Sequence, residues 1–198
     1  NHDYLQNPNA QINNTNWIMP NFYYKKEFDN VLLYFLDTTV FDNNFIHISN
    51  SKIKNIHNKN SYILSIEQLN WLSNDLSLNK NKKKIIFGHY PIITNGLYKY
   101  HVKPIYDKLI DIFYNNKVDF YISGHEHNIQ FIKKKIKNYN FKQIILGSSS
   151  EFRNDPDFST LNNLYDKTDN YYGLLSLGKK NIFNFINKNG VIKYEYIT

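Results

Sequence analysis

The sequence predicts an α/β fold with a mixed sheet, and two observations lead to that prediction. Between residues 22 and 122, short apolar runs alternate with longer segments of helical periodicity, as in parallel strands joined by crossover helices. After residue 128 the helical periodicity stops, and strand-like runs separated by turn residues follow one another. No repeat or linker-like stretch divides the chain, so residues 1–198 are expected to belong to a single domain.

Two strands are expected first, over residues 22–28 and 31–37, with a turn at Asp29-Asn30 between them. The second strand contains a continuous apolar run, which is typical of a strand buried on both faces of a sheet. Residues 41–61 are polar, rich in asparagine and without clear periodicity, so a loop is expected there.

Two helices follow, each leading into a short apolar strand. The capping-box sequence Ser65-Ile66-Glu67-Gln68 predicts the start of the first helix, which apolar residues at helical spacing extend to about residue 78. The second helix is expected over residues 102–114. The strands that follow these helices are predicted at residues 84–87 and 118–122.

The last third of the sequence predicts strands without helices. Gly178-Lys179-Lys180 and Lys188-Asn189-Gly190 are hairpin signals, and residues 148–170 form a polar loop. The predicted strands cover residues 129–135, 141–146, 172–177, 181–187 and 191–197.

Composition limits the classes of function. The net charge of +7 suits a phosphate-bearing substrate or nucleic acid, but Arg153 is the only arginine, and nucleic-acid grooves more often use arginine. We therefore expect solvated lysines and no nucleic-acid partner. The absence of cysteine excludes disulfides, thiolate metal sites and cysteine nucleophiles. No apolar run is long enough for a membrane span in this segment, and no signal peptide is visible.

Four of the seven histidines fall in three short segments, Asn1-His2-Asp3, Gly88-His89-Tyr90-Pro91 and Gly124-His125-Glu126-His127-Asn128. His89 and His125 each follow a predicted strand by a Gly-His step. Parallel strands of one right-handed unit end at the same edge of the sheet, where α/β proteins bind ligands. Both imidazoles are therefore expected to reach one crevice.

His125 and His127 are two residues apart. If the extended conformation persists, their side chains lie on the same side, roughly 6.5–7 Å apart along the backbone. That separation suits two metal ions about 3.5–4 Å apart, each taking one imidazole. Structural histidines are the alternative, and the occurrence of His89, His125 and His127 together favours metal ligation.

Together these segments resemble the last three motifs of the calcineurin-like metallophosphoesterases, and more specifically the mammalian-type purple (tartrate-resistant) acid phosphatases. Phe35-Leu36-Asp37-Thr38 and residues 17–23, 68–72 and 121–130 also follow that family's order and spacing. The resemblance fades after Ser148. It implies a four-layer α/β/β/α sandwich with mixed sheets, of which residues 1–198 would be the C-terminal portion. The family's two earlier aspartate motifs are absent, so we expect the missing N-terminal half of the domain to be a partner.

The resemblance also implies a metal site. Asn1, His89 and His125 would bind the second, divalent metal, and His127 would bind the first. Two metal ions are implied, iron with iron or zinc, with manganese as an alternative. Glu126 stands where the family usually has aspartate, at a position that is not a ligand.

Two further histidines have implied catalytic roles. His2 would hydrogen-bond the phosphate and protonate the leaving oxygen. His101 is the only histidine in the loop after Gly88-His89-Tyr90-Pro91, where the family has a second outer histidine. Alternatively, His101 begins a helix and faces solvent.

The implied function is two-metal hydrolysis of phosphate monoesters, with an acidic optimum, on a phosphorylated small molecule or phosphoprotein. A secreted or endomembrane/vacuolar location is also implied. One alternative is a catalytically inactive phosphatase-fold scaffold, although such relatives usually lose the metal-binding histidines that this chain keeps. The other is a phosphodiesterase or nuclease of the same superfamily, which shares these motifs. The 198 residues alone are expected to be inactive.

Overall fold

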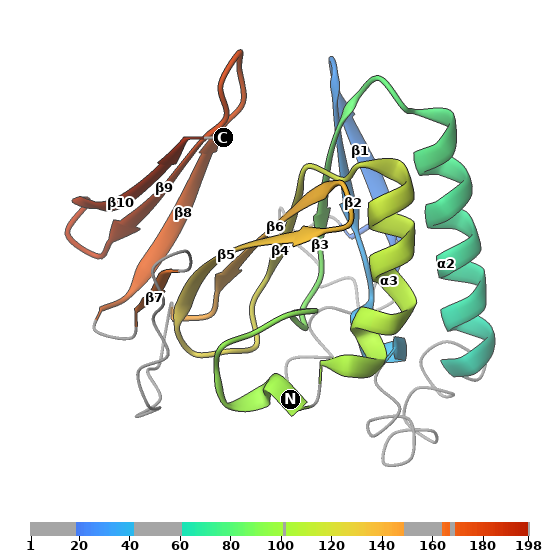
Figure 1. Ribbon diagram of the computed structural model, residues 1–198, viewed down its shortest axis with the longest axis horizontal. Coiled ribbons are helices and arrows are strands. Elements are labelled where there is room, and N and C mark those ends of the chain that lie inside the picture. The colour runs from blue at the N-terminus through green and yellow to red at the C-terminus, as the bar shows by residue number, and fades with distance from the viewer. Residues whose placement is uncertain (1–18, 42–60, 101, 149–163, 167–168, 198) are drawn as a thin grey trace, which may run out of the picture.

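The computed structural model describes residues 19–41, 61–100, 102–148, 164–166 and 169–197, and these form three layers. Figure 1 shows two helices on one side of a seven-stranded mixed sheet and a three-stranded antiparallel sheet on the other. The predicted α/β fold with mixed sheets is confirmed. Within the described residues, no helix is long and apolar enough to cross a bilayer.

The seven-stranded sheet has the order β1-β2-β3-β4-β6-β5-β7. Its central strands β2, β3, β4 and β6 run parallel, whereas β1, β5 and β7 are antiparallel to their neighbours. The carboxyl ends of the parallel strands therefore meet at one edge. The strands are β1 (Tyr24–Phe28), β2 (Val31–Phe35), β3 (Lys83–Phe87), β4 (Phe120–Ser123), β5 (Ile129–Ile136), β6 (Tyr139–Leu146) and β7 (Leu164–Asp166).

Helices α2 (Ser61–Leu78) and α3 (Lys103–Asn116) connect the parallel strands and cover one face of this sheet. The other face packs on the small sheet of β8 (Tyr171–Ser176), β9 (Ile182–Asn187) and β10 (Ile192–Ile197). Successive side chains of β3 pack on opposite faces of the sheet. Ile86 packs with the helices, while Ile85 packs with Phe183 and Phe185 of β9. This alternation follows from the period of two residues in a strand.

The start of the first helix differs from the prediction. Helix α2 begins at Ser61, four residues before the predicted capping box. Ser65 and Leu64 are buried inside the helix, so the prediction that Ser65 opens it is wrong. Burial of Leu64 and Ser65 against the core stabilises the extra turn.

The predicted polar loop over residues 148–170 also needs a correction, because it contains β7, a three-residue strand paired with β5. A strand this short carries no periodic signal. Both predicted hairpins are confirmed, joining β8 to β9 and β9 to β10. A further hairpin joins β5 to β6 through Lys137, whose φ of 55° is in the left-handed region.

Candidate metal centre

The loops after β3 and β4 lie side by side at the carboxyl edge of the parallel strands. The Gly88 N–H donates to the Ile122 carbonyl at 3.0 Å, and the Gly124 N–H donates to the His89 carbonyl at 3.0 Å. These two bonds extend the pairing of β3 and β4 beyond the strand ends. As a result, the His89 Nε2 and His125 Nδ1 atoms lie 3.2 Å apart. The expectation that both imidazoles reach one place is confirmed.

The backbone around His89 is held by a residue just after β2 and by a residue of β4. The Thr38 hydroxyl accepts from the N–H groups of His89 at 3.1 Å and Tyr90 at 3.0 Å. The buried Tyr121 hydroxyl donates to the Tyr90 carbonyl at 2.5 Å. Gly88 leaves room for both anchors, because a Cβ atom there would lie 2.6 Å from Thr38 Cγ2. The position of His89 therefore depends on the residue before it having no side chain.

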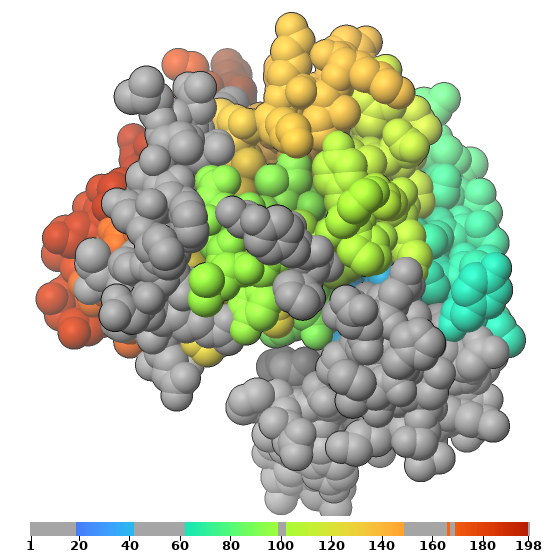
Figure 2. Space-filling model, turned by 60° about the horizontal axis from the view of Figure 1, so that its bottom comes forward, coloured from blue at the N-terminus to red at the C-terminus, as the bar shows by residue number. Residues whose placement is uncertain are grey.

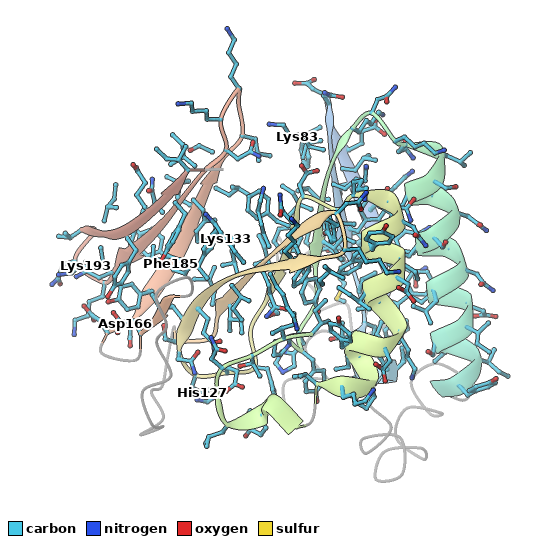
Figure 3. All side chains as sticks on the ribbon, viewed as in Figure 1. Lys83, His127, Lys133, Asp166, Phe185 and Lys193 are labelled. Carbon is cyan, nitrogen blue, oxygen red and sulfur yellow. The ribbon has the colours of Figure 1, made fainter. Side chains whose placement is uncertain are left out.

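The segment between His125 and His127 is a turn. His125 has a φ of 66°, and the Glu126 N–H donates to the Gly124 carbonyl at 2.8 Å. The extended conformation considered for these two histidines is therefore wrong, and the spacing estimated from it does not apply. Figure 3 shows His127 at the same sheet edge, where β5 begins.

The paired histidines fit a metal ion. Ligand nitrogens lie about 2.0–2.1 Å from zinc, so two adjacent nitrogens are roughly 2.8–3.0 Å apart on an octahedral ion and roughly 3.3–3.4 Å apart on a tetrahedral one, a range of about 2.8–3.4 Å. The 3.2 Å separation between His89 Nε2 and His125 Nδ1 falls in that range. His89 is exposed and His125 is half-buried, which leaves the pair accessible from solvent.

Not every predicted site residue can be placed. Asn1, His2 and His101 lie outside the described residues. Within the part of the chain that is described, no three histidine, cysteine or carboxylate side chains form a metal-binding group. A pocket of about 260 Å³ lies next to Asp37, between α2 and the segment before β1, and its lining includes neither His89 nor His125. Figure 2 shows the carboxyl-edge face, with the segment after β3 in green near its middle.

Buried amide side chains support the loop after β3. The Gln143 Oε1 accepts from the N–H groups of Ile92 and Ile93, both at 3.1 Å. The Gln130 Oε1 accepts from the Asn95 N–H at 2.9 Å. We did not predict roles for these glutamines from the sequence. The sequence feature that could have indicated these roles is a glutamine within a mostly apolar strand segment, at positions 130 and 143.

Residues 1–128 of this chain match a family model that is described as "Calcineurin-like phosphoesterase". The relatives include "Tartrate-resistant acid phosphatase type 5" of Sus scrofa, 29% identical over 149 residues, or 67% of this chain and 41% of the relative. "Purple acid phosphatase 17" of Arabidopsis thaliana is 27% identical over 172 residues, covering 82% and 49% of the two chains. The chain therefore spans less than half the length of these relatives.

Two solved structures share the fold. One is "GAP50 the anchor in the inner membrane complex of Plasmodium", with a TM-score of 0.68, 24% identity, and coverage of 98% of this chain and 59% of that one. The other is purple acid phosphatase PPD1 from yellow lupin (Lupinus luteus) seeds, with a TM-score of 0.65, 10% identity, and coverage of 92% and 34%. At these identities the likeness shows the metallophosphoesterase fold alone.

Proposed function

The chain belongs to the calcineurin-like phosphoesterase family, and from that premise we propose that it is part of an acid phosphatase that hydrolyses phosphate monoesters. The observation that supports this most directly is the 3.2 Å approach of His89 Nε2 to His125 Nδ1 at the carboxyl edge of the parallel strands.

We propose that two metal ions bind at this edge, iron with iron or zinc, with manganese as the alternative. Asn1, His89 and His125 would hold one ion, and His127 would hold the other. The remaining ligands would come from segments that the longer relatives have and these 198 residues do not include, since the chain covers 41% of one relative and 49% of another. When bound, such ions supply Lewis-acid polarisation of the phosphoryl oxygens and an activated nucleophile.

The protein's own side chains would act on the substrate. His2 hydrogen-bonds the phosphate and donates a proton to the leaving oxygen, with His101 as the second candidate for this role. The net charge of +7 favours the approach of an anionic substrate, either a phosphorylated small molecule or a phosphoprotein. We propose a secreted or endomembrane/vacuolar location for the protein.

A catalytically inactive scaffold is the second candidate function. The fold similarity that covers 98% of this chain is to a Plasmodium protein described as an anchor. Against a scaffold, the chain keeps the Gly-His step after β3 and the His-x-His segment after β4, and the fold brings His89 and His125 together. The two functions differ in whether the purified full-length protein contains metal and turns over a phosphate ester.

The test compares the full-length protein with its His89→Ala and His2→Ala variants. Wild type is expected to contain two metal ions, at least one of them iron, and to hydrolyse p-nitrophenyl phosphate. His89→Ala is expected to lose metal and activity together. His2→Ala is expected to keep both metals while turnover falls by roughly 10²- to 10⁴-fold, with a smaller loss for good leaving groups. His57→Ala, at a histidine of the predicted polar loop over residues 41–61, serves as the control.

Each failure has a different meaning. Full-length protein without metal and without turnover would overturn the phosphatase and favour the scaffold. Metal loss in His2→Ala would show that His2 is a metal ligand. Unchanged metal content and turnover in His2→Ala would show that His2 is not the acid, and His101 would be the next candidate. Two zinc ions and no iron would contradict only the proposed metal identity.

A further inference from the structure

We propose that Glu126 and Tyr98 are positioning residues of the histidine pair. Glu126 accepts hydrogen bonds from the loop of residues 94–98, and we call these bonds the latch. The loop fixed in this way holds the Tyr98 ring against the His125 ring. The inference rests on the proposed function, because the histidine that it positions is a proposed metal ligand. The hydrogen bonds of Glu126 and the contact between the Tyr98 and His125 rings can be measured in the metal-free protein.

The first step is the burial of a carboxylate between two candidate ligands. Glu126 lies between His125 and His127 in the sequence, and its side chain is fully buried. Burying a carboxylate is costly unless hydrogen bonds compensate for the lost solvation. Its Oε1 atom accepts from the Thr94 hydroxyl at 2.9 Å and from the Tyr98 N–H at 3.2 Å. Both donors belong to the loop after β3.

The second step is the close fit around this carboxylate. A Cβ atom on Gly96 would lie 2.5 Å from the carboxyl carbon of Glu126, and a Cβ atom on Gly147 would lie 2.6 Å from its carbonyl carbon. Only glycine fits at these two positions without displacing Glu126. The loop and the start of the His-x-His segment are therefore packed together from both sides.

The third step is the network of buried hydrogen bonds around Thr94, which cross-links the loop. The Thr94 hydroxyl, which donates to Glu126, also accepts from the Gly96 N–H at 2.9 Å and from Gln130 Nε2 at 3.0 Å. Gln130 in turn donates to Asn128 Oδ1 at 2.9 Å. Connected buried hydrogen bonds of this kind stiffen the segment that they cross-link.

The fourth step is the contact that the latch produces. The Tyr98 ring centroid lies 4.4 Å from that of His125, and the Tyr90 centroid lies 4.5 Å from it. Tyr98 is half-exposed and belongs to neither apolar cluster of the described residues, so core packing does not account for its position. Two aromatic contacts limit rotation of the His125 ring and keep its Nδ1 atom directed at His89 Nε2. Groups that orient a ligand in this way commonly alter metal affinity by 10- to 100-fold.

The experiment uses the full-length protein and two measurements. Titration of the metal-free protein with zinc measures affinity, and NMR measures proximity between the Tyr98 and His125 rings without metal. Tyr98→Ala is expected to weaken zinc binding by about 10- to 100-fold. Tyr98→Phe keeps the ring and should restore affinity to within about threefold. Leu97→Ala is the matched control, because Leu97 is half-exposed and lies beside Tyr98 in the short 3-10 helix Leu97–Tyr100.

The latch is tested separately with Thr94→Val, which removes the donor to Glu126 and preserves side-chain shape. Loss of the Tyr98–His125 proximity signal, with weaker zinc binding, is the expected result. An unchanged signal would overturn the latch, and unchanged affinity in Tyr98→Ala would overturn the positioning role. If wild type binds none of zinc, iron and manganese while the proximity signal is present and is lost in Thr94→Val, the proposed function fails and the latch stands.

Discussion

At the scale of single residues, the candidate site depends on Gly88, which the side chains of Thr38 and Tyr121 surround. Gly88 precedes His89, and its missing Cβ leaves room for Thr38 and for the Tyr121 hydroxyl. Thr38 and Tyr121 are both buried, so neither can move aside cheaply. Any side chain at position 88 must therefore displace either the anchors or His89.

Gly88→Ala is accordingly expected to lower the free energy of unfolding by about 1–3 kcal/mol, the usual cost of overpacking a core. It should also reduce metal content, because His89 moves with its backbone. Gly124→Ala is the matched control, since the nearest atom to a Cβ there is the Leu146 carbonyl oxygen at 3.8 Å. Its stability should change by less than about 1 kcal/mol. Urea denaturation and elemental analysis provide the measurements, and equal effects of the two substitutions would contradict the steric explanation.

At the scale of elements, α2 is tied to the end of β2 by a buried amide. The Gln68 Oε1 accepts from the Asp37 N–H at 2.8 Å, and its Nε2 donates to the Asp37 carbonyl at 3.0 Å. The side chain thus pairs with the backbone just past β2 as a neighbouring strand would. Asp37 precedes Thr38, which anchors the backbone of His89. We therefore expect the helix to influence the position of His89 through this one glutamine.

Gln68→Met keeps the volume and removes both hydrogen bonds, leaving two backbone groups of Asp37 unpaired. The expected cost is about 1–3 kcal/mol for each group that stays buried. Amide hydrogen exchange should accelerate at Asp37 and at His89. Asn70→Met, at an exposed position of the same helix, should change neither stability nor exchange. Exchange at His89 that stays as slow as in wild type would show that the helix and the site are not coupled.

At the scale of the whole molecule, buried tyrosine hydroxyls lie on the helix-facing side of the large sheet. Burial raises the pKa values of Tyr121 and Tyr139. Burial also raises the pKa of Tyr34, and its hydrogen bond to Asp75 adds to this effect. Ionisation of any of these hydroxyls would place an anion in the core, so alkaline conditions favour the unfolded chain.

Stability should therefore be retained up to about pH 9 and fall above it, because tyrosines of the unfolded chain ionise with a pKa of about 10. Above that pH the unfolded state binds fewer protons than the folded state. The free energy of unfolding then falls with rising pH, by up to about 1.4 kcal/mol per pH unit for each such tyrosine. Urea midpoints between pH 8 and 11 measure this slope. Tyr121→Phe should make the slope shallower, whereas Tyr172→Phe, at a half-exposed position, should not. Identical slopes in all three proteins would contradict the prediction.

The sequence by itself determined the order of strands and helices and the meeting of His89 with His125. Apolar periodicity marks the strands, and parallel strands of one right-handed unit end at one edge regardless of the details of packing. A Gly-His step after each of two such strands was therefore enough to place both imidazoles together. The structure agrees with that expectation, because the two ring nitrogens lie 3.2 Å apart.

Tertiary structure alone decided the turn at His125, the early start of α2, the short strand β7 and the buried support of the loop after β3. A positive φ is uncommon at residues other than glycine, and although histidine adopts it more often than most, the sequence does not mark which histidine will. Glu126 reaches Thr94 and Tyr98 across 32 and 28 residues of sequence, and Gln143 reaches Ile92 across 51. These conformations are stabilised by hydrogen bonds between residues far apart in the chain, and periodicity and propensity describe only neighbours. For that reason the histidines could be named from the sequence, whereas the residues that orient them could not.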